Sequence, residues 1–269
     1  MSQTSLSLWS STDLIPLWNP AFGQAPPALI PFLLPGENVR PCVLVFPGGG
    51  YTCRCESYEG VEICEALNAA GFHACMVQYR VNPYRHPCME IDARRAIRTV
   101  RYHAKAWHID PDAIGTLGFS AGGHLVCMTG LRFDAAEPKT DEIDLVSARP
   151  DSVCACYAVT MLTGDKVCPT MPENTVGDPA DPALCRALSA PLIARENAPP
   201  FYIWHTAEDQ LVPVENALLL AGALREKRVP CELHVFPHGG HGLGLAKATP
   251  TADQWFGLYV NWLNTCAFK

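Results

Sequence analysis

The segment Gly118-Phe119-Ser120-Ala121-Gly122 matches the G-x-S-x-G pattern that presents a serine as a nucleophile. Residues 113–117 before it form a short apolar run that predicts a strand, and the residues from Gly123 onward predict a helix. A serine between a strand and a helix stands on a tight turn, and glycines at 118 and 122 avoid a steric collision there. Because the pattern alone also occurs by chance, a nucleophile at Ser120 requires partner residues elsewhere in the chain.

A serine hydroxyl is a weak nucleophile until a neighbouring base takes its proton, so an acid and a histidine should follow. Asp209 comes directly after the apolar run 201–204, and His241 comes directly after the run 232–236. The carboxyl ends of parallel strands are the places where open α/β sheets build their sites. The sequence therefore predicts a triad of Ser120, Asp209 and His241.

Two neighbours are alternatives for the acid and the base of this triad, namely Glu208 and His238. We favour Asp209 because Val212-Pro213, just downstream, leads into the next predicted helix. We favour His241 because glycines on both sides permit the turn that presents an imidazole. The remaining histidines that we considered are interpreted as structural, including the one at a strand end near the presumed site: His73, His103, His108, His124 and His205.

Acyl transfer also needs backbone N–H groups to bind the oxyanion of the tetrahedral intermediate. The Ala121 amide, directly after the nucleophile, is one candidate. The Gly48-Gly49-Gly50 loop follows the apolar run 43–46, and we expect Gly49 and Gly50 to supply the others. A phosphate-binding loop is excluded as the explanation of these glycines, because no G-x-x-x-x-G-K-[ST] or G-x-G-x-x-G motif follows a strand.

The composition is that of a compact enzyme-sized chain: 269 residues, 48% of them hydrophobic and 17% charged, with a formal net charge of −7. This length predicts one α/β domain over 1–269. The negative charge argues against binding to nucleic acid or to an anionic membrane. Residues 1–9 resemble no signal peptide, and no apolar run reaches the roughly 20 residues of a membrane span, so we expect a cytoplasmic protein.

The 13 cysteines are odd in number and irregularly spaced. Several lie inside apolar segments, and in a chain without an export signal we expect most of them to be small, reduced core residues. The pairs Cys53/Cys55 and Cys154/Cys156 lack a matching histidine set, so no metal site is predicted.

From Pro41 onward, short apolar runs alternate with helix-length segments, which is typical of βαβ units around a parallel sheet. Residues 6–9 and 28–34 are expected to add antiparallel edge strands, and 164–197 to make an excursion that covers the pocket. Residues 92–107 predict an amphipathic helix. Its arginines are expected to face solvent, with binding to an acidic partner as the alternative: Arg94, Arg95, Arg98 and Arg101. Further strands are expected at 43–46, 73–79, 113–117, 153–159, 201–204 and 232–236, and further helices at 60–70, from 123, at 214–227 and at 252–266.

With the triad and the glycine loop placed, five segments carry a resemblance to a known family. They are Phe46-Pro47-Gly48-Gly49-Gly50-Tyr51, Tyr58-Glu59-Gly60, Tyr79-Arg80-Val81, the serine motif extended to Leu125, and His241-Gly242-Leu243-Gly244-Leu245. The chain resembles the α/β-hydrolase superfamily over almost its whole length. More narrowly, it is similar to the acetylxylan-esterase-like carbohydrate esterases, which are related to hormone-sensitive-lipase-like and prolyl-peptidase-like hydrolases. Pro47 stands where lipase-like relatives carry a histidine, which favours the esterase branch.

This resemblance implies an α/β-hydrolase fold with a mostly parallel sheet, helices on both faces and no large cap. It implies a serine esterase that removes short acyl groups, above all acetyl, from xylo- or related oligosaccharides through an acyl-enzyme. We expect Tyr51 and other aromatic residues near the pocket to stack on the sugar. No metal or organic cofactor is implied. The expected partner is a small-molecule or oligosaccharide ester, and a homo-oligomer stays open.

Two rival functions also stay open. A serine peptidase or aminoacyl hydrolase would use the same triad, although no recognition element for a peptide terminus is evident. A non-catalytic binding module on a hydrolase scaffold is the other, although such modules usually lack a member of the triad.

Overall fold

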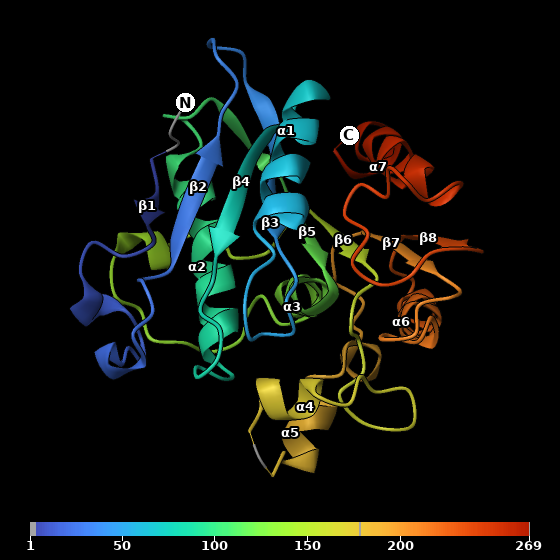
Figure 1. Cartoon of the computed structure of the whole chain (residues 1–269). Coiled ribbons are helices and arrows are strands. Elements are labelled where there is room, and N and C mark those ends of the chain that lie inside the picture. The colour runs from blue at the N-terminus through green and yellow to red at the C-terminus, as the bar shows by residue number, and fades with distance from the viewer. Residues whose placement is uncertain (1–3, 178, 269) are drawn as a thin grey trace.

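Short apolar runs build an eight-stranded sheet at the centre of the computed structural model, which describes residues 4–177 and 179–268 (Figure 1). The strand order is β1-β2-β4-β3-β5-β6-β7-β8. The pairs from β4 to β8 are all parallel, whereas β2 is antiparallel to both of its neighbours. The strands are β1 (Leu6–Ser7), β2 (Ala28–Phe32), β3 (Arg40–Phe46), β4 (His73–Gln78), β5 (Ile109–Phe119), β6 (Ser152–Cys156), β7 (Phe201–Thr206) and β8 (Cys231–Phe236).

Helices cover both faces of this sheet. Buried residues of α1 and α7 form one hydrophobic cluster with the strands, and those of α2, α3 and α6 form another. The predicted fold class, a mostly parallel sheet with helices on both faces, is therefore confirmed. The helices are α1 (Glu62–Ala69), α2 (Cys88–His103), α3 (Ser120–Leu131), α4 (Met171–Thr175), α5 (Pro182–Ala187), α6 (Glu215–Glu226) and α7 (Trp255–Trp262). Within the described residues, no helix has the length and hydropathy needed to cross a membrane.

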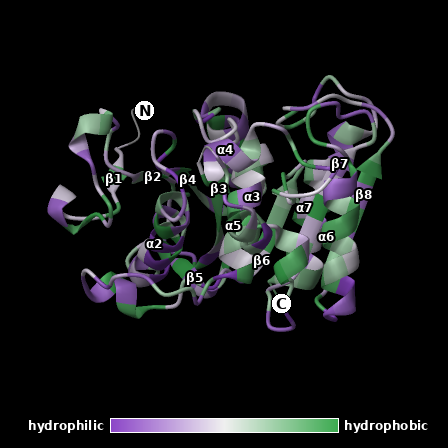
Figure 2. Ribbon diagram, turned by 90° about the horizontal axis from the view of Figure 1, so that it is seen from below, coloured by the Kyte–Doolittle hydropathy of each residue, from purple (hydrophilic) through white to green (hydrophobic). Residues whose placement is uncertain are grey.

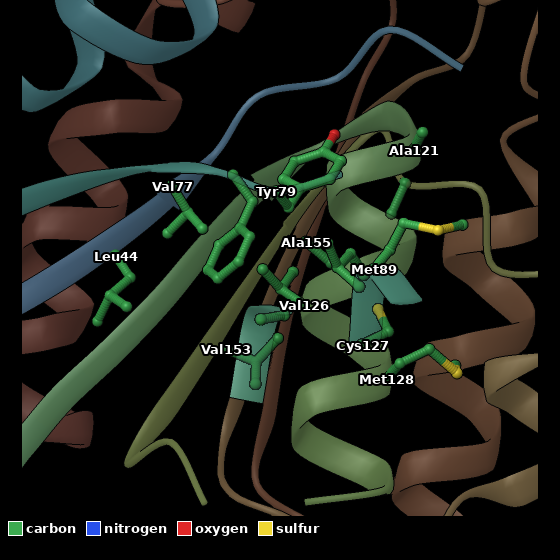
Figure 3. Close-up of a cluster of buried hydrophobic side chains, with 14 of the residues drawn as sticks. Leu44, Val77, Tyr79, Met89, Ala121, Val126, Cys127, Met128, Val153 and Ala155 are labelled. Atoms are coloured by element: carbon green, nitrogen blue, oxygen red, sulfur yellow. The ribbon is translucent and has the colours of Figure 1, made fainter. Parts of the chain in front are cut away.

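Helix α3 lies in the middle of the molecule, and all twelve of its residues are buried. A helix that is apolar all round belongs in a core, and the sequence of α3 has no charged residue. Figure 3 shows Val126 and Cys127 of α3 beside Val153 and Ala155 of β6 in that core. The first residue of α3 is thereby held firmly at the end of β5.

The prediction that the arginines of α2 face solvent is wrong for Arg94 and Arg95, which are buried. The segment that follows α3 folds over this face of the helix and brings carboxylates to it. Arg94 pairs with Glu137 at 2.8 Å, and Arg95 pairs with Asp144 at 2.9 Å. Figure 2 shows that α2 carries hydrophilic residues, although most of the helix is buried.

Glu90 of α2 is a buried carboxylate with three cationic or polar neighbours, His86 at 3.0 Å, Arg94 at 3.1 Å and Arg132 at 3.2 Å. Burial alone would raise the pKa of Glu90. The hydrogen bond from His86 and the two guanidinium charges outweigh burial and lower this pKa to about 2.

Glu90→Gln should therefore lower the free energy of unfolding at pH 7 by about 3–5 kcal/mol, the usual cost of breaking a buried ion pair. A carboxyl group whose pKa is lower in the folded state stabilises the fold above its unfolded pKa, about 4.3 for glutamate, and loses this effect on acidification. Urea unfolding at pH 7 and pH 3 measures the free energy of unfolding of wild type and variant. The difference between the two proteins should be smaller at pH 3 than at pH 7. A gap that is constant across this range would contradict the ion-pair explanation.

The excursion between β6 and β7 contains α4, α5 and a 3-10 turn at Ala190–Ile193. Figure 1 shows α4 and α5 beyond the sheet, on the side towards which the arrowhead of β4 points. Asn174 of α4 donates a hydrogen bond of 2.8 Å to the carbonyl of Gly50, which ties this excursion to the glycine loop.

Candidate active site

Ser120 stands on a strained turn at the junction of β5 and α3. Its φ of 53° lies in the left-handed region, which costs free energy for a residue with a side chain. A Cβ at Gly118 would collide with the Gly122 carbonyl, and one at Gly122 would collide with the Phe46 carbonyl. The glycines on either side of the serine are thus required by the close approach of backbone, as the sequence motif predicts.

The structure brings Ser120, His241 and Asp209 into one chain of hydrogen bonds. The Ser120 hydroxyl lies 2.8 Å from Nε2 of His241, and Nδ1 of His241 lies 2.7 Å from Oδ2 of Asp209. With Nδ1–H donating to the carboxylate, Nε2 is left as an acceptor for the serine proton. This arrangement lets the imidazole act as a general base towards the serine.

Asp209 is buried and its oxygens are fully engaged. Oδ1 accepts hydrogen bonds of 2.9 Å from the amides of both Leu211 and Val212. Nε2 of the buried His205 lies 3.3 Å from Oδ2. Burial alone would raise the pKa of Asp209, but hydrogen bonds from His205, His241 and the Val212 amide outweigh it and hold the pKa well below its usual value. The carboxylate is therefore charged at neutral pH, as an imidazolium partner requires.

The two alternatives for the triad contact each other instead. Nδ1 of His238 lies 3.0 Å from Oε1 of Glu208, and both side chains are exposed. His205, interpreted from the sequence as structural, is buried and donates a hydrogen bond of 2.9 Å to the Val212 carbonyl. The sequence did not predict that it would also lie against Asp209.

The glycine loop after β3 is folded so that its carbonyls are occupied. The Gly48 carbonyl accepts from the amide of Cys55, and the Gly49 carbonyl accepts from the amides of Thr52 and Cys53. Gly49 and Gly50 have φ values of 128° and 61°, which favour glycine. Both residues line the same cavity as Ser120. Their amides, with that of Ala121 in the first turn of α3, are the candidate donors for an oxyanion.

The cavity at Ser120 has a volume of about 290 Å³. The glycine loop, the residues that follow it, the excursion and the histidine loop all contribute to its wall. It is lined by Gly49, Gly50, Cys53, Cys55, Tyr58, Glu59, Ser120, Val159, Cys168, Thr170, Met171, Leu211, His241 and Gly242. Neither at this cavity nor at any other place in the described residues do three or more His, Cys, Asp or Glu side chains lie together so that they could bind a metal ion.

The prediction that Tyr51 stacks on a sugar is wrong. Its side chain is only 1% exposed, and its hydroxyl donates a hydrogen bond of 2.7 Å to Nδ1 of His124. The positive φ of 59° at Tyr51 turns the chain after the glycine loop, and the ring packs against Tyr79 in the core. The aromatic ring that does line the cavity is Tyr58, which is 39% exposed.

Sequence reasoning assigned no role to Glu59 or Tyr157, although both lie at the site. Glu59 lines the cavity and accepts a hydrogen bond of 2.7 Å from the Tyr157 hydroxyl. The Tyr157 ring lies against the imidazole of His241, with ring centroids 5.0 Å apart. The only signal for Glu59 was the Tyr58-Glu59-Gly60 motif within the family resemblance.

Comparison with known proteins identifies the family of this chain. The BD-FAE family model matches residues 33–224. Endo-1,4-beta-xylanase B of Butyrivibrio fibrisolvens is 36% identical over 86% of the chain, and an acetylxylan esterase of Xylanibacter ruminicola is 29% identical over 86%. The chain spans 36% and 47% of the lengths of these two relatives.

Among solved structures, an acetyl ester-xyloside bifunctional hydrolase from Caldicellulosiruptor lactoaceticus is 43% identical. It superposes with a TM-score of 0.93 over 97% of this chain and 96% of its own. The resemblance to acetylxylan-esterase-like hydrolases that the motifs indicate is therefore confirmed. By its sequence match and by this structural likeness, the chain belongs to the BD-FAE family and has the α/β-hydrolase fold.

Proposed function

We propose that this protein is a serine carboxylesterase that removes short acyl groups, above all acetyl, from xylo-oligosaccharides or related sugars. The observation that carries the proposal is the hydrogen-bonded chain from Ser120 through His241 to Asp209, which opens into a cavity beside the glycine loop. Family membership and the esterases among the relatives support the same reaction.

In the proposed reaction, Oγ of Ser120 attacks the ester carbonyl carbon while Nε2 of His241 takes the hydroxyl proton. The amides of Gly49, Gly50 and Ala121 donate hydrogen bonds to the oxyanion that forms. His241 then gives the proton to the departing sugar oxygen, which leaves an acyl group on Ser120. Water, deprotonated by the same imidazole, releases the acid and restores the serine.

The size of the cavity favours a short acyl group. At about 290 Å³ it lies at the lower limit of ordinary ligand pockets, which hold roughly 300–1,000 Å³. Met171 of the excursion, Val159 and Leu211 supply apolar walls. These side chains suit a methyl group and leave little room for a long acyl chain.

The sugar side of the substrate is proposed from the relatives and from Tyr58. The names of the relatives include an acetylxylan esterase, a xylanase and an acetyl ester-xyloside hydrolase, all of which act on xylose-containing compounds. Tyr58 presents a part-exposed ring beside His241 and Gly242 on the cavity wall. Such a ring offers apolar area to the carbon face of a sugar.

Tyr58→Ala should raise KM for acetylated xylo-oligosaccharides about tenfold, the equivalent of ~1.4 kcal/mol of lost contact. Tyr58→Phe keeps the ring and should keep KM near the wild-type value. For ethyl acetate, whose alcohol offers no sugar to stack, kcat/KM should change little in either variant. Equal losses on both substrates in Tyr58→Ala would show that the ring supports the site rather than the sugar.

The proposed function is tested by acetyl release from acetylated xylo-oligosaccharides, alongside p-nitrophenyl acetate, butyrate and octanoate, with Ser120→Ala as the blank. Acetyl release that disappears in the variant is the expected result. Activity on p-nitrophenyl esters alone would support an esterase and contradict the proposed sugar substrate. Activity on aminoacyl amides without acetyl release would favour the peptidase, and no turnover of any substrate would favour a binding module.

A further inference from the structure

Glu59 is a carboxylic acid that the proposed reaction does not use, yet it is buried beside Ser120 with only 2% of its surface exposed. A buried carboxyl group is costly unless its oxygens are hydrogen-bonded. Oε2 of Glu59 accepts a hydrogen bond of 2.8 Å from the Gly48 amide, and Oε1 accepts one of 2.7 Å from the Tyr157 hydroxyl. Each of its two oxygens is thus engaged with a different segment of the site.

The Tyr157 hydroxyl continues this chain to a third segment. It accepts a hydrogen bond of 3.0 Å from the amide of Gly244, three residues after His241. The Tyr157 ring also lies against the His241 imidazole, at an interplanar angle of 69°. A continuous path of hydrogen bonds therefore joins the glycine loop, through Glu59 and Tyr157, to the loop that carries the histidine.

Close packing holds Glu59 at the point where these loops meet. A Cβ at Gly60 would collide with Met76 and lie 3.3 Å from Pro47, the residue before the glycines. A Cβ at Gly244, whose φ is +54°, would lie 2.8 Å from the Tyr58 carbonyl. The π-helical turn Ser57–Val61 is therefore wedged between the glycine loop and the histidine loop, with no space for side chains at its contacts.

The Gly48 hydrogen bond has a direct consequence for the oxyanion site. The amide of Gly48 is bound to Glu59, so the candidate donors of the glycine loop are the amides of Gly49 and Gly50, the two glycines that line the cavity. A carboxylate is suited to this position because it accepts at both oxygens, whereas a glutamine amide has one acceptor only. With glutamine, either the Gly48 amide or the Tyr157 hydroxyl loses its acceptor.

We propose that Glu59 is a positioning residue, which acts through Gly48 and Tyr157 to hold the oxyanion-binding amides in register with His241. This inference rests on the proposed function, in which those amides and that imidazole act on the same tetrahedral intermediate. A displacement of about 1 Å between such groups can cost a factor of about 100 in rate. Glu59 thereby affects the transition state without contacting the substrate.

The test compares Glu59→Gln and Tyr157→Phe with the control Glu62→Gln. Glu62 is an exposed carboxylate three residues away that binds Lys247. With p-nitrophenyl acetate, Glu59→Gln should lower kcat by about 100-fold at unchanged KM. Tyr157→Phe keeps the ring and the Gly48 contact but removes both hydrogen bonds of the hydroxyl, to Glu59 and from the Gly244 amide, so it should lower kcat by about tenfold. Glu62→Gln should match wild type.

A second readout separates positioning from general stability. Paraoxon phosphorylates an activated serine once, and its P=O oxygen takes the place of the oxyanion. The rate of Ser120 phosphorylation, followed by intact-protein mass, should fall by the same factors as kcat while thermal unfolding shows a folded protein. If Glu59→Gln does not fold, Tyr157→Phe provides the same test.

The outcomes distinguish the two proposals. Folded variants with wild-type kcat and phosphorylation rate would overturn the role of Glu59, as would a rise in KM with unchanged kcat. A wild-type protein that paraoxon phosphorylates but that hydrolyses no ester would overturn the proposed function, while the phosphorylation rates of the variants still test Glu59. A protein that shows neither reaction would overturn both.

Discussion

Replacing Ser120 or His241 by alanine should each lower kcat for acetyl ester hydrolysis by about 10⁶-fold, leaving only the residual catalysis that binding and the oxyanion donors supply. The reason is that the two side chains perform one step together. The hydroxyl is nucleophilic only while Nε2, 2.8 Å away, accepts its proton, and the imidazole has no catalytic use without the hydroxyl.

The effects of the two substitutions should not add. The double variant Ser120→Ala with His241→Ala should retain the same residual activity as either single variant, because each alone removes the whole proton transfer. Initial rates with p-nitrophenyl acetate, corrected for hydrolysis in buffer, measure this. His238→Ala is the matched control. The His238 imidazole is exposed and contacts Glu208, so its removal should leave kcat unchanged.

An alanine at 241 that costs less than about tenfold, or one at 238 that abolishes turnover, would contradict the assignment of the base. A double variant far below the single ones would indicate that serine and histidine act in separate steps.

The sequence predicted the three residues of the triad and their places at strand ends because local rules decide them. A glycine on each side of Ser120, an apolar run before it and a buried helix after it leave one backbone path, and the collisions found at Gly118 and Gly122 are those that the motif implies. The same holds for Asp209 and His241, which follow the strands β7 and β8. Residues placed by strand ends are predictable because a sheet brings its strand ends together.

Tyr51, Arg94 and Arg95 were mispredicted for a shared reason: their surroundings come from distant segments. Proximity to the glycine loop suggested a ring in the pocket, but the backbone at Tyr51 turns the ring towards His124, 73 residues away. Helical periodicity placed Arg95 on the polar face of the helix. The segment around Asp144 covers this polar face, and Asp144 forms an ion pair with Arg95. Periodicity separates polar from apolar faces and does not report whether another segment covers the polar one.

Glu59 was missed because its partners are a backbone amide and a tyrosine 98 residues later. No spacing rule connects these groups. The boundaries of elements differ as well: helix α2 begins at Cys88, ahead of the predicted start at Asp92, and Glu90 in its first turn contacts His86, Arg94 and Arg132.

Asp209→Asn should lower kcat by about 10⁴-fold at neutral pH while leaving the protein folded. Asparagine has nearly the shape of aspartate and keeps an oxygen for the amides of Leu211 and Val212. Its NH₂ group then points at His241, where the carboxylate oxygen had accepted the proton of Nδ1. The imidazole would present an N–H to Ser120 in place of the acceptor that the reaction needs.

Glu208→Gln is the control for this substitution, because Glu208 is the exposed carboxylate next in the chain and the alternative acid in the sequence. It should retain kcat. A large loss in Glu208→Gln together with a small one in Asp209→Asn would reverse the assignment of the acid.

The pH dependence of stability provides an independent check on the charge of Asp209. Its pKa in the folded protein is below the ordinary value, so the carboxylate stabilises the fold at every pH above its unfolded pKa, about 3.9. This stabilisation is lost as the pH falls through the folded pKa. In chemical unfolding, Asp209→Asn should therefore have a lower free energy of unfolding than wild type at pH 7. This difference should become smaller below about pH 4. A gap that widens on acidification would mean that burial, rather than the hydrogen bonds from His205, His241 and the Val212 amide, dominates at this carboxyl group, and that the triad holds a neutral acid.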